Sequence, residues 1–319
     1  MKKYIVKRVI GLIPLLLVVS IFSFLILQAA PGSPIDNYMQ PGMTEDRIEA
    51  LKEEYGLNGS IAEQYWYWLK HVLQGDMGTS ISKNRPVTEL IAERLPATVS
   101  LMGASLLISI VCSIPLGLIA GLHKDRPMDK VISTITYFGI SIPPFWIAMI
   151  SVIIFAIKLR CFPTGGMHSL DVESTADTLW HMVLPACVLS LNHTAVYTKY
   201  IRSNTISQLE EDYVVTAVSK GTNKNIILFC HVLKNCLLPI ITLIGMNIAG
   251  LVCGSFIIEN IFSWPGIGRL CMEAVGGRDY PVIMGYTMFS CLILIVGNLV
   301  ADVLYAVADP RIREGMGRK

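Results

Sequence analysis

Long apolar runs constrain the fold of this chain more than any other feature of its sequence. Several runs are about 20 residues long, which is the length that a helix needs to cross the roughly 30 Å hydrocarbon core of a bilayer. Of the 319 residues, 53% are hydrophobic and only 16% are charged, whereas a soluble domain has about 25% charged residues. The sequence therefore predicts an all-α integral membrane protein.

The apolar runs predict about six transmembrane helices. They cover residues of about 9–30, 99–122, 131–158, 181–202, 236–258 and 283–306. The apolar part of the first run is longer than the h-region of a signal peptide, so we expect an uncleaved anchor. Basic residues concentrate on one side of a six-span arrangement, and the positive-inside rule places that side and both termini in the cytoplasm.

These spans predict four parts of the chain. They are an N-terminal anchor span (1–30), an external helical segment (31–97), a transmembrane core (98–306) with a cytoplasmic loop at 206–235, and a cytoplasmic tail (307–319). The loop falls between the fourth and fifth spans.

The external segment is expected to be folded. Thr44 can cap a helix over residues 45–55, and Ser60 with Glu63 forms a capping-box pattern for a second helix that ends at Gly75. The second helix carries four adjacent aromatic residues, 65–68, which suit the membrane–water boundary. A further short helix is predicted from Pro86 to Arg94.

Proline and glycine residues predict breaks and turns within the transmembrane core. Pro143 and Pro144 predict a break or kink in the third span, because proline removes a backbone donor and clashes with the preceding turn. After the fifth span, Trp264, Pro265 and Gly266 lie in turn-rich sequence that predicts an external loop, and with the two prolines they are candidates for the pathway.

Common catalytic motifs are absent from the sequence. It contains no GxxxxGK[ST], HExxH or GxSxG pattern and no GxGxxG after a strand, so it is not expected to be an enzyme or to hydrolyse ATP through such a site. The eight cysteines lack metal-ligand spacing, although Cys161 and Cys271 fall in predicted external loops and could pair. The formal net charge of +2 does not suggest a nucleic-acid partner.

A polar segment, EEDYVVTAVSKGTNKNIILFCHVLKN at 210–235, interrupts the apolar runs. Its apolar residues recur at near-helical spacing on both sides of Gly221, which predicts two short helices hinged at that glycine. Such helices could insert into a groove on a soluble partner, or they could pack on the ends of this chain's own spans.

This segment resembles the cytoplasmic loop of the permease subunits of binding-protein-dependent ABC importers, in the dipeptide/oligopeptide/nickel class. The matching residues are Glu211, Asp212, Tyr213, Thr216, Ala217, Lys220, Gly221, His231, Leu233 and Asn235, and the departures are Val218 and Ser219. Further motifs similar to the family follow in order: YGLN at 55–58, GDMGTS at 75–80, RPV at 85–87, LPAT at 95–98, SIPPFW at 141–146, ENIFSWPGIGR at 259–269, RDYPV at 278–282 and DPRIR at 309–313.

The resemblance implies a transport subunit with several partners. These are a sister permease subunit, two ATPase subunits that bind ATP and Mg²⁺, and an extracellular solute-binding protein. The loop would be the ATPase-coupling element: Gly221 would end the docking helix, Lys220 and nearby acids would orient it, and Val214 and Ala217 would supply apolar contact.

The resemblance leaves the substrate open between small peptides and nickel or a nickel chelate. Weak candidates for nickel ligands are Met167, His168 and His181, since thioether and imidazole groups suit that metal. Their spacing fits ordinary surface residues equally well. A membrane scaffold or receptor without transport is the distant alternative.

Overall fold

The computed structural model describes residues 2–30, 44, 46, 49, 59–172, 174–223, 226–236, 240, 245 and 255–308. Across these residues the chain consists of helices and turns, with one isolated bridge between Thr79 and Pro86. This confirms the expected all-α fold class. The helix predicted over 45–55 lies largely outside the described residues.

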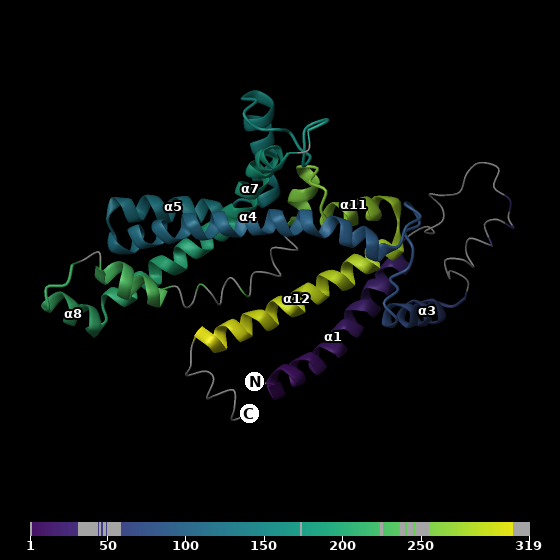
Figure 1. Cartoon of the computed structure of the whole chain (residues 1–319), viewed down its shortest axis with the longest axis horizontal. Helices are drawn as coiled ribbons and strands as arrows, with labels where there is room; N and C mark the ends of the chain where they lie inside the picture. The colour runs from purple at the N-terminus through teal and green to yellow at the C-terminus, as the bar shows by residue number, and fades with distance from the viewer. Residues whose placement is uncertain are drawn as a thin grey trace. The chain divides into compact units, whose positions relative to one another are not determined.

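The described helices run along the chain in the order drawn in Figure 1. They are α1 (Lys2–Ala29), α3 (Ile61–Leu73), α4 (Val87–Leu122), α5 (Pro127–Ser141), α6 (Pro144–Ser151), the π-helix η2 (Val152–Lys158), α7 (Thr175–Leu209), α8 (Asp212–Ser219), the π-helix η3 (Ile227–Val232), α11 (Ile267–Gly277) and α12 (Tyr280–Ala308).

Three of these helices are long and apolar enough to cross a membrane. They contain the segments Val87–Leu122, Thr175–Leu209 and Tyr280–Leu299. The bent pair Pro127–Ser141 and Pro144–Lys158 adds a fourth span if it is counted as one, and Ile13–Ala29 and Ile227–Cys236 are shorter apolar helices. Most of the fifth predicted span, 236–258, lies outside the described residues, so the count of six stays a prediction.

The predicted break at Pro143-Pro144 is confirmed, and the two halves of the third span differ in direction by 99°. Ile142, which precedes the prolines, has an extended backbone (φ −86°, ψ 128°), as a following proline requires. Pro144 then opens α6 at its first turn, where a missing N–H removes no helical hydrogen bond.

One expected boundary was wrong. The short helix predicted from Pro86 to Arg94 is the first part of α4, which runs without interruption from Val87 to Leu122. Pro96 lies inside this helix and does not end it. The family motif LPAT therefore lies within a long helix and not at its start.

Contacts divide the chain into two units, one formed by Met1–Thr98 with Pro265–Ile295, the other by Val99–Trp264 with Val296–Lys319. In the first unit α3 packs against α1. The capping box of Ser60 and Glu63 is present, and Tyr65 forms a hydrogen bond of 2.8 Å with Ser20 of α1. Of the four adjacent aromatics, Trp66 and Tyr67 remain exposed.

In the second unit the core lies where α4, α5 and α7 approach closely. A Cβ atom added at Gly117 would lie 2.5 Å from the Ile201 Cβ, and one at Gly121 would lie 2.6 Å from the Thr205 Cβ. These glycines let α4 and α7 pack backbone against side chain, as small residues do in membrane helix pairs. Leu118, Tyr197 and Ile201 are buried there.

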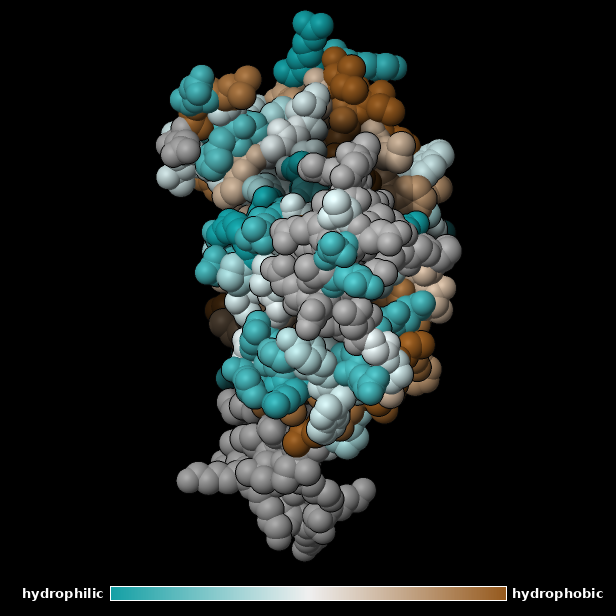
Figure 2. All heavy atoms as spheres, turned by 90° about the vertical axis from the view of Figure 1, so that its right-hand side faces the viewer, coloured by the Kyte–Doolittle hydropathy of each residue, from teal (hydrophilic) through white to brown (hydrophobic). Residues whose placement is uncertain are grey.

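The surface mixes polar and apolar regions. On the face drawn in Figure 2, hydrophilic and hydrophobic residues both reach the surface, and a group of hydrophobic residues is exposed near the top. Many large apolar side chains are exposed elsewhere too, for example Ile135 and Phe138 of α5 at 64% each. Such a surface agrees with a chain that lies partly in lipid.

Candidate functional site

The 206–235 loop forms two short helices after α7. The first, α8, ends at Gly221, whose φ of +74° lies in the left-handed region. The Gly221 N–H donates to the Val218 carbonyl, and the Thr222 N–H donates to the Ala217 carbonyl. These two bonds make a Schellman motif, which favours glycine at this position. The predicted hinge at Gly221 is therefore part of the C-terminal cap of α8, directly after the C-cap residue Lys220.

The two helices of the loop pack on each other through a small apolar cluster. It consists of Val214 from α8 with Ile227, Val232 and Cys236, all of them buried, and Ala217 packs against it. This corrects one expectation: Val214 is only 6% exposed and stabilises the loop itself, so it offers no surface to a partner. The sequence left open whether the loop helices pack on a partner or on the chain itself. The Val214 side of α8 packs on the chain itself.

The rest of the α8 surface, beginning directly beside Val214, carries the exposed residues. Val215 and Val218 are 58% and 59% exposed, and Glu211, Asp212, Thr216 and Lys220 are exposed around them. Val218 is one of the two positions at which the loop departs from the family pattern. This face, not the Val214 face, is the part of α8 that a partner can reach.

The two ends of the loop motif meet at one glutamine, Gln208. The Tyr213 hydroxyl donates to the Gln208 Oε1 at 2.8 Å, and the Asn235 Nδ2 donates to the same oxygen at 3.0 Å. The Asn235 Nδ2 also lies 3.3 Å from the Tyr213 oxygen, and the ring centroids of Tyr213 and His231 are 6.4 Å apart. The structure thus brings together Tyr213, His231 and Asn235, and adds Gln208, which the sequence pattern did not single out.

A second polar contact lies next to the loop, at the start of α5. Asp129 is 2% exposed and accepts two hydrogen bonds from the Arg202 guanidinium, at 2.5 and 2.7 Å. It also accepts from the Asp125 N–H at 2.8 Å and from the Ser133 hydroxyl at 3.2 Å. Sequence analysis missed this pair because Asp129 and Arg202 are 73 residues apart.

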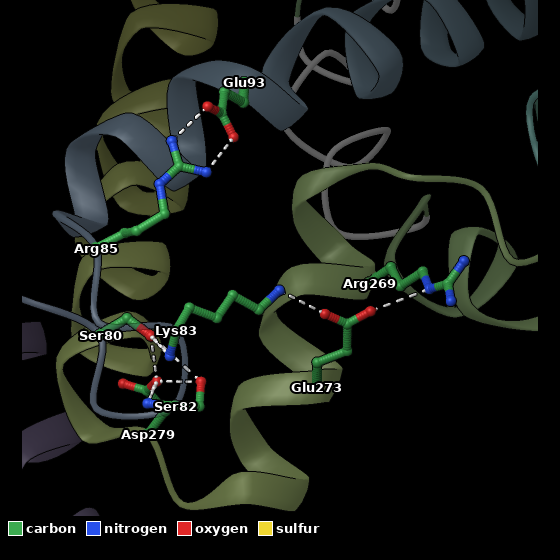
Figure 3. A network of polar contacts seen from close by, with 8 residues as sticks. All are labelled: Ser80, Ser82, Lys83, Arg85, Glu93, Arg269, Glu273 and Asp279. Carbon is green, nitrogen blue, oxygen red and sulfur yellow. Dashed lines mark hydrogen bonds and ion pairs between the residues drawn. The ribbon is translucent and has the colours of Figure 1, made fainter.

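In the other unit, a buried carboxylate organises the segment before α4. Asp279 is fully buried and accepts from the Ser80 hydroxyl at 2.6 Å, the Ser82 hydroxyl at 2.7 Å and the Ser82 N–H at 2.9 Å (Figure 3). Every one of these contacts joins residues about 200 positions apart. Asp279 belongs to the RDYPV motif and Ser80 to GDMGTS, so two family-like motifs meet here.

Ion pairs extend this network along α11. Lys83 donates to Glu273 at 2.8 Å, and Arg269 lies 3.2 Å from the same carboxylate (Figure 3). Burial would raise the pKa of Glu273, but the hydrogen bond and charge of Lys83, with the charge of Arg269, hold that pKa below its usual value. The segment before α4 is therefore tied to α11 at Glu273 and to the turn after α11 at Asp279.

A pocket of about 370 Å³ lies in the same unit as this network, and it was not anticipated from the sequence. Its walls combine aromatic and aliphatic side chains with a few polar groups, including Phe24, Gln28, Tyr67, Trp68, His71, Asp76, Tyr280 and Met284. The Gln28 Nε2 donates to the Gln64 Oε1 at 2.6 Å at its edge. Its volume lies within the range of small-molecule sites.

The weak nickel candidates have ordinary structural partners. The His181 ring is buried, with its Nδ1 2.9 Å from the Asp177 carbonyl oxygen, and the His168 Nδ1 is 3.2 Å from the Thr178 hydroxyl. Met167 is partly buried. Among the described residues, no three His, Cys, Asp or Glu side chains lie close enough together to hold a metal ion.

The remaining candidates occupy a turn, a loop and helix α11, where Cys271 lies and not in the external loop expected for it. Trp264 is fully buried, and its N–H donates to the Glu259 carbonyl at 2.8 Å; Gly266 is the N-cap of α11 and Pro265 precedes it. Cys161 is an exposed free thiol, and Cys271 is a buried free thiol whose pKa is raised by burial to about 12.

Comparison with known proteins covers nearly the whole chain. Residues 113–314 match the family described as the binding-protein-dependent transport system inner membrane component, and residues 1–102 match its N-terminal family. The chain is 43% identical over 314 residues to the oligopeptide transport system permease protein AppB of Bacillus subtilis, covering 98% of this chain and 99% of AppB. It is 36% identical over 313 residues to the glutathione transport system permease protein GsiC of Salmonella typhimurium, with the same coverage.

A solved structure agrees in fold. A chain of the inward-facing MetNI methionine ABC transporter superposes with a TM-score of 0.52 at 11% identity, covering 68% of this chain and 97% of that one. The ordered motifs, the helical fold and these full-length matches lead to one conclusion: the chain belongs to the binding-protein-dependent ABC transport permeases of the inner membrane, and within them to the peptide class.

Proposed function

We propose that this chain is the permease subunit that carries small peptides across the membrane in an ATP-driven importer. The observation that carries the proposal is the near-complete alignment with permeases of oligopeptide and glutathione transport systems, at 43% and 36% identity. A nickel importer of the same class is the alternative. The separate partners of His168 and His181 give nickel no local support.

The proposed machine needs subunits that this chain does not supply. A sister permease pairs with it, an extracellular solute-binding protein delivers the peptide, and two ATPase subunits hold ATP and Mg²⁺. Both termini and the 206–235 loop face the cytoplasm, so that α8 reaches an ATPase. Its exposed face, with Val215 and Val218, supplies the apolar contact, since exposed apolar patches mark interaction sites.

The proposed movement follows from how α8 is attached. ATP binding brings the ATPase subunits together, and each carries the α8 that is docked on it. Because α8 is packed on η3 and bonded to Gln208 at the end of α7, its displacement is passed to a membrane-spanning helix. The transport pathway then turns to face outward and receives the peptide.

Uptake in cells lacking the gene tests this function. Labelled dipeptide and labelled nickel are offered side by side, with and without the gene restored on a plasmid. We expect the deletion to lower dipeptide uptake alone and the plasmid to restore it. Loss of nickel uptake alone would make the chain a metal importer, and no change in either would contradict both substrates. The double variant His168→Ala/His181→Ala is the matched control, and it should import dipeptide normally.

A further inference from the structure

The last two turns of α7 carry three polar residues at intervals of three: Arg202, Thr205 and Gln208. Residues three apart lie on neighbouring parts of one side of a helix. Six residues of helix rise about 9 Å. Each of the three side chains contacts a different element, and we call these three residues the α7 cluster.

Arg202 connects α7 to α5. Its guanidinium donates two hydrogen bonds to the buried Asp129 carboxylate. Paired bonds of this kind fix orientation as well as distance, because both planar groups must align. Asp129 in turn accepts from the Asp125 N–H of the α4–α5 turn, so that the turn is held to the same helix.

Thr205 connects α7 to α4 and to the loop at once. Its methyl side lies against Gly121, where a Cβ would approach within 2.7 Å of the Thr205 Cγ2. Its hydroxyl lies 3.7 Å from the Cys236 sulfur at the end of the second loop helix. Thr205 itself is fully buried.

Gln208 connects α7 to both helices of the loop. A single side-chain oxygen accepts from Tyr213 of α8 and from Asn235. Tyr213 and Asn235 are 22 residues apart, and each is part of the loop motif. This junction therefore adds polar contacts to the apolar cluster that holds α8 beside the end of α7.

We infer that Gln208 is a positioning residue, which, with Arg202 and Thr205, makes the end of α7 a rigid junction between α4, α5 and the coupling loop. The inference rests on the proposed function, in which α8 receives the movement of an ATPase. Gln208 touches neither substrate nor nucleotide. It sets the angle of α8, and thereby the share of the ATPase movement that reaches the membrane helices.

The test uses the complete transporter with its binding protein in proteoliposomes. Gln208→Met removes the accepting oxygen at similar length, Gln208→Glu keeps an acceptor, and Ser207→Met places the same side chain at the adjacent exposed position. Dipeptide uptake and ATP hydrolysis are measured together. We expect Gln208→Met to lower the peptides imported per ATP by about fivefold or more, with Gln208→Glu and Ser207→Met close to the wild type.

Tyr213→Phe completes a double-mutant cycle. If Gln208 acts through Tyr213, the double variant Gln208→Met/Tyr213→Phe should lose no more coupling than the worse single variant, because contacting residues are not additive. A role in assembly alone would lower uptake and ATP hydrolysis in equal proportion. Three results would each overturn the inference: equal loss of uptake and ATP hydrolysis, additive losses in the double variant, or an unchanged number of peptides imported per ATP in Gln208→Met.

A second measurement does not depend on the substrate. Amide hydrogen exchange of residues 212–219 reports how firmly α8 is held. We expect Gln208→Met, and not Ser207→Met, to speed this exchange by about tenfold, corresponding to about 1.4 kcal/mol of local opening. If the wild type imports no peptide, the proposed substrate fails while this measurement still decides the role of Gln208; unchanged exchange contradicts it.

Discussion

At the scale of single residues, buried polar side chains join parts of the chain that are distant in sequence. The buried Asp279 accepts from Ser80 and Ser82, and the buried Asp129 accepts from Arg202. The half-buried Gln208 accepts from Tyr213 and Asn235. A buried acceptor of this kind is favourable only while its donors are in place, since an unpaired buried donor costs about 1–3 kcal/mol.

Asp279→Ala should therefore destabilise the protein strongly. The change leaves the Ser80 and Ser82 hydroxyls and the Ser82 N–H without their acceptor, and we expect a loss of about 3–5 kcal/mol in the free energy of unfolding. Unfolding in mixed micelles measures it. Glu273→Ala is the control: its carboxylate is 38% exposed, so the loss should stay below about 1 kcal/mol. Equal losses would contradict the role of Asp279.

Gly221→Pro should leave the chain in the membrane and abolish uptake. Proline holds φ near −65° and lacks the N–H that Gly221 donates to Val218, so the C-cap of α8 cannot form. Gly221→Asn is the matched control, because asparagine tolerates a positive φ. Membrane content by immunoblot and dipeptide uptake are compared. Normal uptake by Gly221→Pro would rule out a coupling role for this cap.

At the scale of elements, the distance between α4 and α7 is set by glycine. An added Cβ at Gly117 meets the Ile201 side chain at 2.5 Å and the Thr198 carbonyl oxygen at 3.0 Å. The same helix contains Gly103, around which an added Cβ meets no atom within 4 Å. A comparison of alanine variants at these two positions therefore distinguishes the effect of close packing from the effect of helix propensity.

Gly117→Ala and Gly103→Ala should change stability in opposite directions. Alanine favours a helix over glycine by about 0.5–1 kcal/mol, so Gly103→Ala should be neutral or slightly stabilising. Gly117→Ala must push α4 from α7, and we expect it to cost about 1–3 kcal/mol. Thermal unfolding in detergent gives both values. A stabilising Gly117→Ala would mean that the two helices are not in close contact.

The bend of the third span can be predicted from its sequence. Two consecutive prolines cannot continue the helix that ends at Ser141, and the halves on either side bend by 99°. By contrast, Pro96 lies within α4 without ending it. A single proline is tolerated in a membrane helix, because neighbouring groups can satisfy the freed carbonyl.

At the scale of the whole molecule, the proposed topology can be tested with single cysteines. In chains that keep one cysteine each, Cys161 should react with a membrane-impermeant maleimide from outside the cell, and Cys230 only in inverted vesicles; both are exposed. Buried Cys271, with a pKa of about 12, remains a protonated thiol at pH 8 and should react in neither. Labelling of Cys230 from outside would reverse the proposed orientation.

Much of the fold and part of the site followed from the sequence. The capping box at Ser60, the break at Pro143 and the end of α8 at Gly221 were predicted correctly, since each depends on residues within a few positions of one another. Val214 was expected to contact a partner, and it is instead buried in the loop. The apolar face of a short amphipathic helix does not by itself reveal whether it meets a partner or the chain itself.

By itself, the sequence determined that the chain is helical, lies in the membrane and resembles the dipeptide/oligopeptide/nickel class of ABC permeases, because hydrophobic length and ordered local motifs carry that information. Only the tertiary structure decided that Asp129 meets Arg202, that Asp279 holds Ser80 and Ser82, and that Gln208 joins both ends of the loop. These pairs are separated by up to 199 positions. Their partners become neighbours only through the packing of helices, which no local pattern specifies.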